Sequence, residues 1–126
     1  HNIDNTPSPE EMARLIHIRD KYLNPIREKF GSAIIISSGF RGEALNTMVG
    51  GERTSNHLFG EAVDLVPANK DFDKLIKVIH NFLQETKLPF DEFLIEKNKR
   101  SKWIHLAVRQ RQGTPNRSKI LRINLA

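Results

Sequence analysis

Glycine is unevenly distributed along this chain of 126 residues, and its clustering limits how the chain can fold. Five of the seven glycines fall between residues 39 and 60, with polar residues between them. Glycine loses more backbone entropy on folding than any other residue, so a long glycine-rich stretch is costly in a small domain. Long loops in compact domains are usually functional. We therefore expect residues 39–60 to build a site.

A helix is predicted before the glycine-rich stretch. Ser8 can cap it, Pro9 suits its first position, and Glu11 completes a capping box. Pro25 is expected to kink or end this helix before Gly31. Apolar residues at helical spacing should face the core, namely Met12, Leu15, Ile16, Tyr22, Leu23 and Ile26.

The rest of the chain is predicted to form short strands and one amphipathic helix, at residues 71–85. Residues 33–38 contain a run of three β-branched isoleucines and are bounded by glycines, which predicts a short buried strand. The other predicted strands are residues 61–66, 90–96, 103–108 and 120–125, of which 90–96 and 103–108 form an antiparallel hairpin. We expect one α+β domain over residues 1–126, with a small antiparallel sheet carrying the site and helices on its other face.

The chain contains no cysteine, and this restricts its chemistry. Disulfides, thiolate zinc sites and a cysteine nucleophile are all excluded, so His, Asp and Glu must hold any metal. The longest apolar run falls far short of the ~20 residues that a membrane span needs. The first four residues carry no signal-peptide pattern.

Positive charge is concentrated at the end of the chain. Residues 97–126 carry nine Lys and Arg and no acid, whereas residues 1–96 carry 11 Lys and Arg against 15 Asp and Glu. Such a basic end can bind nucleic acid, anionic lipid or an anionic polymer, or it can be a solvated surface and tail. No nucleic-acid recognition motif accompanies the charge, so we expect no specific nucleic-acid binding. Residues 109–126 form the basic C-terminal segment of the domain.

Two predicted strands are each interrupted by one polar, titratable residue. Asp64 stands between Val63 and Leu65, although Asp is depleted in strands. A buried carboxylate needs a partner, and a divalent cation is an effective one, whereas the alternative is a local cap or salt bridge. His105 interrupts the later strand in the same way, where a lone His would usually be a packed core residue. With His57 at the end of the glycine-rich stretch, the set becomes two His and one carboxylate with an open fourth position, an arrangement of catalytic zinc.

The hairpin register suggests a base for this site. If Lys97 pairs with Lys102, Glu96 lies opposite Trp103 and diagonally from His105, at a distance that a water can bridge. A carboxylate there could take a proton from the attacking water and pass it to the leaving amine. The alternative is a salt bridge with the neighbouring lysines. The other histidines of the predicted helices, His17 and His80, are better explained by packing or exposure.

Several short motifs, each present once, are spread along nearly the whole chain. They are Ser38-Gly39-Phe40-Arg41, Ser55-x-His57-x-x-Gly60-x-Ala62-x-Asp64, Phe90-Asp91-x-x-x-Ile95-Glu96, Trp103-Ile104-His105 and Asn116-Arg117. In these motifs the chain resembles the zinc D-alanyl-D-alanine carboxypeptidases and related L-alanyl-D-glutamate endopeptidases of bacteria and phages. That family shares its fold with the hedgehog signalling domain.

The resemblance implies a site as well as a fold. His57, Asp64 and His105 would bind one zinc ion per chain. Arg41 would hold the scissile carbonyl or a substrate carboxylate, since a fixed guanidinium can stabilise an oxyanion. Ser55 looks like a substrate-contacting residue, with a turn-capping hydroxyl as the alternative.

One departure concerns the base. Several relatives place the catalytic Glu three residues before the last His, and that position is Lys102 here. The subset that this chain most resembles has its Glu at the end of the preceding strand, as Glu96 is.

The resemblance also implies a substrate. We expect hydrolysis of an amide bond in peptidoglycan stem peptides at the bacterial cell wall, by a D,D-carboxypeptidase or an endolysin-type endopeptidase. We also expect a monomer whose basic end binds an anionic cell-wall polymer. The alternative is a zinc-bearing, non-catalytic binding module of the same fold, against which the presence of both Glu96 and Arg41 argues.

Overall fold

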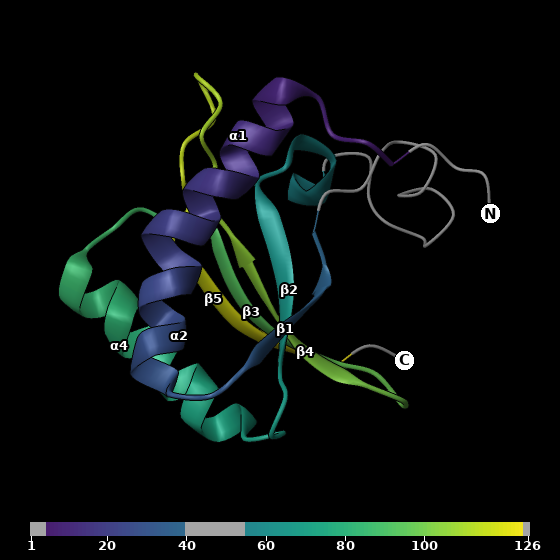
Figure 1. Cartoon of the computed structure of the whole chain (residues 1–126), viewed down its shortest axis with the longest axis vertical. Helices are drawn as coiled ribbons and strands as arrows, with labels where there is room; N and C mark the ends of the chain where they lie inside the picture. The colour runs from purple at the N-terminus through teal and green to yellow at the C-terminus, as the bar shows by residue number, and fades with distance from the viewer. Residues whose placement is uncertain (1–4, 40–54, 125–126) are drawn as a thin grey trace.

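Helices and a five-stranded sheet make up the structure, a computed structural model that describes residues 5–39 and 55–124. The helices are α1 (Pro9–Ile18), the π-helix η1 (Arg19–Leu23), α2 (Asn24–Phe30), the 3₁₀-helix η2 (Asn56–Phe59) and α4 (Phe72–Thr86). The strands are β1 (Ile34–Ser38), β2 (Ala62–Pro67), β3 (Glu92–Lys97), β4 (Lys102–Ala107) and β5 (Lys119–Asn124). Helices α1, α2 and α4 lie together on one side of the sheet (Figure 1). The predicted α+β class is confirmed.

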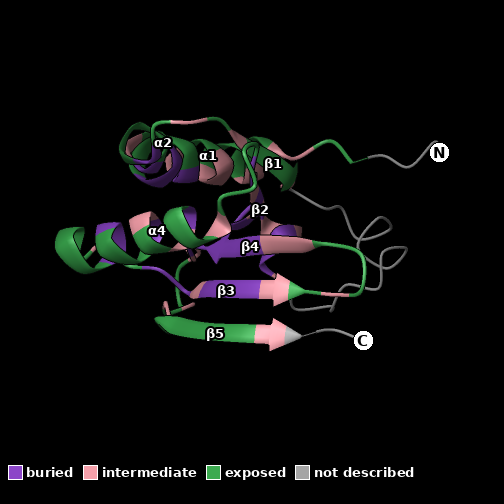
Figure 2. Cartoon of the chain, turned by 90° about the horizontal axis from the view of Figure 1, so that it is seen from below, coloured by how far each residue is buried: buried purple, intermediate pink, exposed green. Residues whose placement is uncertain are grey.

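The sheet has the strand order β1-β2-β4-β3-β5, and all neighbours are antiparallel except β3 and β5. The parallel pair departs from the purely antiparallel sheet that the sequence predicts. It arises because the chain reverses direction between β4 and β5, so that β5 runs alongside β3 in the same direction. Figure 2 shows β3 and β4 largely buried in the middle of the sheet.

Successive side chains of each strand point to opposite faces of the sheet, and the two faces carry different residues. Residues Val63, Leu65, Phe93, Ile95, Ile104 and Leu106 belong to the main hydrophobic core, together with buried residues of the helices. Asp64, Leu94 and His105 alternate with these core residues and pair side by side across the strands. The polar residues that interrupt the strands therefore lie on the face opposite the helices, as predicted.

The first helix begins as predicted, with a complete capping box. The Ser8 side chain accepts from the Glu11 N–H at 3.1 Å, and the Glu11 side chain accepts from the Ser8 N–H at 2.7 Å. Pro25 has no N–H for the carbonyl four residues earlier, and the turn before it is the π-helix η1. The helical segment then continues to Gly31, which ends it with a left-handed φ of 76°.

Two sequence predictions about burial are wrong. Met12 and Ile16 are exposed rather than packed in the core. The buried line instead runs through Ile18, Tyr22 and Ile26, and Met12 and Ile16 are offset from it around the helix.

Strand β1 was expected to be buried, but Ile35 and Ile36 are 49% and 53% exposed. An apolar run suggests a strand covered on both faces, whereas β1 is an edge strand that pairs with β2 alone. None of the described helices has the length and apolar character that a membrane span requires.

Candidate metal centre

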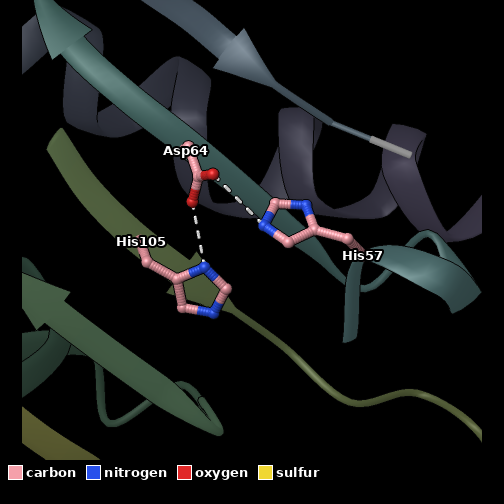
Figure 3. A group of neighbouring side chains, drawn as sticks. All are labelled: His57, Asp64 and His105. Atoms are coloured by element: carbon pink, nitrogen blue, oxygen red, sulfur yellow. Dashed lines mark hydrogen bonds and ion pairs between the residues drawn. The ribbon is translucent and has the colours of Figure 1, made fainter. Parts of the chain in front are cut away.

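Three side chains from separate elements meet on the face of the sheet opposite the helices. His57 comes from η2, Asp64 from β2 and His105 from β4, and Figure 3 shows both imidazoles directed at the Asp64 carboxylate. Asp64 Oδ2 lies 3.3 Å from His57 Nε2, and Asp64 Oδ1 lies 3.0 Å from His105 Nδ1. Each residue offers a ligand atom, and these atoms all lie within 4.8 Å of one another. The structure thus brings together the three residues that the sequence predicts as metal ligands.

Strand pairing and a tight turn hold this geometry. The β2–β4 register places Asp64 directly opposite His105. His57 reaches them because η2 ends at Gly60, whose φ of 69° lets the chain turn into β2. A Cβ on Gly60 would stand 2.5 Å from the Glu11 carbonyl oxygen, so glycine is also needed for the close approach to α1.

Each imidazole is held at its far nitrogen, and this decides what its near nitrogen can do. His57 Nδ1 lies 2.7 Å from the Gly39 carbonyl oxygen, which can only accept, so this nitrogen donates. His105 Nε2 lies 3.1 Å from a carboxylate oxygen of Glu92, which likewise accepts. In neutral imidazoles the nitrogens that face Asp64 are then left with free lone pairs. Metal-binding histidines are typically held in this way, so these residues fit a metal ion.

The charges around the cluster also favour a cation. Burial by itself lowers the pKa of His105, but hydrogen bonds to Asp64 and Glu92 outweigh burial and raise that pKa to about 9. Burial of Asp64 is likewise outweighed by its hydrogen bonds to His105 and His57, which hold its pKa below the ordinary value. The carboxylates of Asp64 and Glu92 thus stabilise positive charge at this position. Two imidazole nitrogens and one carboxylate, without sulfur, form a donor set that suits zinc.

The geometry agrees with a comparison against protein families. The model of the family Peptidase M15 matches residues 2–107. The chain belongs to the Peptidase M15 family. Membership makes it a zinc-dependent metallopeptidase, which agrees with the predicted zinc and the predicted enzyme class. The match ends before the basic C-terminal segment, and no curated protein matches the chain.

Glu96 lies beside the cluster of this M15 peptidase, where the hairpin register predicts it. Lys97 pairs with Lys102 and Glu96 with Trp103, as expected. One Glu96 carboxylate oxygen lies 4.0 Å from His105 Nδ1, the nitrogen that also faces Asp64. Burial raises the pKa of Glu96. A carboxylate with a raised pKa, beside the proposed ligand atoms, is suited to accept and return a proton.

Of the two predicted substrate contacts, Arg41 and Ser55, the structure describes only Ser55. Arg41 lies outside the described residues, as does most of the glycine-rich stretch. Ser55 precedes η2 and its hydroxyl accepts from the His57 N–H at 3.2 Å, so it has the turn-capping geometry that was the alternative. Its contact with substrate remains a prediction.

Glu92 and Asn56 were not predicted as site residues. Glu92 contacts His105, and Asn56 Nδ2 donates to the same Glu92 oxygen at 3.0 Å. The register that places Glu96 could also have placed Glu92, because both flank Leu94, which pairs with His105. Asn56 gives no comparable signal, because its partners, Asp91 and Glu92, are distant in sequence.

Proposed function

We propose that this chain hydrolyses an amide bond in the stem peptides of bacterial peptidoglycan. The observation that carries the proposal is the cluster of His57, Asp64 and His105 with Glu96 beside it, in a member of the Peptidase M15 family. The reaction is cleavage by water, either of a terminal D-alanine or within the peptide.

The proposed zinc ligands are His57 Nε2, the Asp64 carboxylate and His105 Nδ1. Bound zinc supplies Lewis-acid chemistry, which polarises the scissile carbonyl and makes water a better nucleophile near neutral pH. The protein holds both imidazoles in place through the Gly39 carbonyl and Glu92. Both histidines are buried, and these low-dielectric surroundings strengthen the electrostatic interactions within the cluster.

Glu96 is the proposed proton carrier. Its carboxylate takes one proton from the attacking water while the water oxygen bonds to the carbonyl carbon. It then gives that proton to the amide nitrogen, the C–N bond breaks, and a carboxylic acid and a free amine leave. Arg41 is proposed to stabilise the oxyanion or to hold a substrate carboxylate, and Ser55 to contact the substrate.

The basic residues 97–126 support wall binding less than their number suggests, because three of the arginines pair with acids of the same chain. In the C-terminal segment 109–126, Arg109 and Arg117 pair with Asp91, and Arg111 pairs with Glu61. Attraction to an anionic wall polymer would therefore rest on the other basic residues of 97–126. Binding to purified wall at low and high salt measures it, and binding that is indifferent to salt would count against electrostatic attraction.

Mass spectrometry of muropeptides tests the proposed reaction. Zinc-loaded wild type should convert them to products that differ by loss of D-alanine, or by scission of the stem or cross-bridge with gain of water. Glu96→Gln with the same zinc content serves as the control and should leave nearly all substrate intact. An unchanged profile with zinc-loaded wild type would contradict hydrolysis and favour a non-catalytic binding module.

A further inference from the structure

Asp91, directly before β3, is a fully buried carboxylate with a complete set of partners. It accepts from Arg117 Nε at 2.9 Å and from Asn56 Nδ2 at 2.9 Å, and Arg109 Nε lies 3.2 Å away. Arg117 Nη2 and the Arg117 backbone N–H add contacts at 2.9 and 3.1 Å. Such saturation offsets the cost of burying the charge, and it ties the C-terminal segment to β3.

Glu92, the next residue, is held by the same groups and reaches the metal cluster. Its Oε1 accepts from Asn56 Nδ2 at 3.0 Å, and its Oε2 lies 3.5 Å from Arg117 Nη2. The same Oε1 lies 3.1 Å from His105 Nε2. Both oxygens of Glu92 are therefore fixed, and one of them points at a proposed metal ligand.

The contact is on the far side of the imidazole from the proposed metal position. His105 faces Asp64 with Nδ1 and Glu92 with Nε2. An acceptor at Nε2 keeps the hydrogen on that nitrogen, leaves the lone pair on Nδ1 and fixes the ring orientation. Glu92 is thus placed to orient a ligand, whereas the ligand atoms that gather within 4.8 Å belong to His57, Asp64 and His105.

We propose that Glu92 is the positioning residue of His105, and that Arg117 and Asn56 hold Glu92 for this task. The proposal rests on the proposed role of His105 as a metal ligand. It gives the C-terminal segment a part in the metal centre, although the family match ends at residue 107. Asn56 also directly precedes His57, so the same cluster connects the regions that carry both histidines.

Zinc affinity, measured by competition with a chromogenic chelator, tests this role without any need for turnover. Glu92→Ala should weaken zinc binding about 10- to 100-fold, the usual cost of losing a partner of a metal-binding His. Glu92→Gln should recover most of this loss, because an amide oxygen still accepts from Nε2. Arg117→Ala should weaken binding by less than Glu92→Ala, because Arg117 acts through Glu92 and is 45% exposed.

A second buried acid on the same chain offers matched controls. Glu61 is as buried as Asp91, and its carboxylate accepts from Arg111 Nε at 2.7 Å and from the Gln110 N–H. Glu61→Gln and Arg111→Ala should lower stability while leaving zinc affinity within about twofold of wild type, because this pair does not touch His105. If these controls weakened zinc binding as much as Glu92→Ala does, general destabilisation would explain the effect and the proposal would be overturned.

Nitrogen NMR of zinc-loaded wild type keeps the proposal open to refutation even if Glu92→Ala does not fold. The expected spectrum has His105 bound through Nδ1 with a hydrogen on Nε2. Zinc on Nε2, or equal affinity in Glu92→Ala and wild type, would overturn the role of Glu92. Failure of the proposed hydrolysis would instead appear in the muropeptide profile, which these two measurements do not involve.

Discussion

The two histidines of the cluster are anchored in different ways. The region around His57 relies on backbone, because a carbonyl oxygen of Gly39 holds the far nitrogen of the ring. The region around His105 relies on side chains, because Glu92 holds that ring and is itself held by Asn56 and Arg117. A backbone carbonyl survives almost any single substitution, whereas a carboxylate does not. Point substitutions should therefore tune the His105 region far more readily than the His57 region.

Removal of either histidine should cause the largest loss of zinc affinity, and the loss should be the same for His57 as for His105. Structural zinc sites of zinc-finger peptides bind with roughly 10–16 kcal/mol, so on that scale one ligand of three or four is worth about 4 kcal/mol. His57→Ala and His105→Ala should each weaken zinc binding about 1,000-fold in a chelator competition. The two regions should differ only when the group that holds the far nitrogen of each ring is changed, the Gly39 carbonyl for His57 and the Glu92 carboxylate for His105. One zinc per chain bound at wild-type affinity in either variant would remove that histidine from the ligand set.

Glu96→Gln should come next in size, and it separates catalysis from metal binding within the His105 region. The amide keeps the shape of the side chain but cannot carry the proton, so kcat should fall about 10²- to 10⁴-fold. Zinc affinity should stay close to wild type. Muropeptide turnover and zinc titration on the same preparation provide both readouts. Turnover at the wild-type rate would refute the role of Glu96 as base.

Acid should weaken the side-chain-anchored region through Asp91. Burial alone would raise the pKa of Asp91, but hydrogen bonds from Arg117 and Asn56 outweigh it and hold the pKa below the ordinary value. A lowered folded-state pKa contributes stability above the unfolded value of about 3.9, and this stability is lost as pH falls through the folded value.

Asp91→Asn should therefore cost about 2 kcal/mol at pH 7, a modest value because Arg117 is half exposed and can be resolvated. The cost should shrink below pH 4. Urea unfolding of the metal-free protein at pH 7 and pH 3 measures both values. A cost that is the same at both pH values would mean that the ionised Asp91 carboxylate adds nothing.

Ser55→Ala should have the smallest effect on metal binding and tests the backbone-anchored region. Loss of the cap should cost at most about 1 kcal/mol of stability. Zinc affinity should change by no more than about threefold, since the His57 ring is held by Gly39 rather than by Ser55. A tenfold loss of zinc affinity would show that this region depends on side chains too. A raised KM with unchanged zinc binding would instead support the substrate contact predicted for Ser55.

Local patterns explain which features the sequence could predict. The capping box at Ser8 and the register of the hairpin depend on residues close in sequence, and both were predicted correctly. Asp64 and His105 could be predicted as ligands because a polar residue inside an apolar strand is visible without knowledge of the fold. A single sequence does not reveal which residues of one strand will lie opposite another strand far along the chain, except through such anomalies.

The missed features depend on contacts between distant segments. Asp91 and Arg117 are 26 residues apart, and Asn56 and Asp91 are 35 residues apart, so no periodicity connects them. In the sequence Arg117 was part of a charge excess, whereas in the fold it neutralises a buried acid. The exposure of Ile35 and Ile36 was missed for a related reason, because an apolar run does not tell an edge strand from a central one.

A crystal structure of the zinc-loaded protein, with anomalous diffraction collected at the zinc edge, tests the metal centre most directly. The expected map has one zinc peak per chain, contacted by His57 Nε2, the Asp64 carboxylate and His105 Nδ1, with Glu92 on His105 Nε2. A zinc peak that lies elsewhere, or that contacts His105 through Nε2, would contradict the proposed centre.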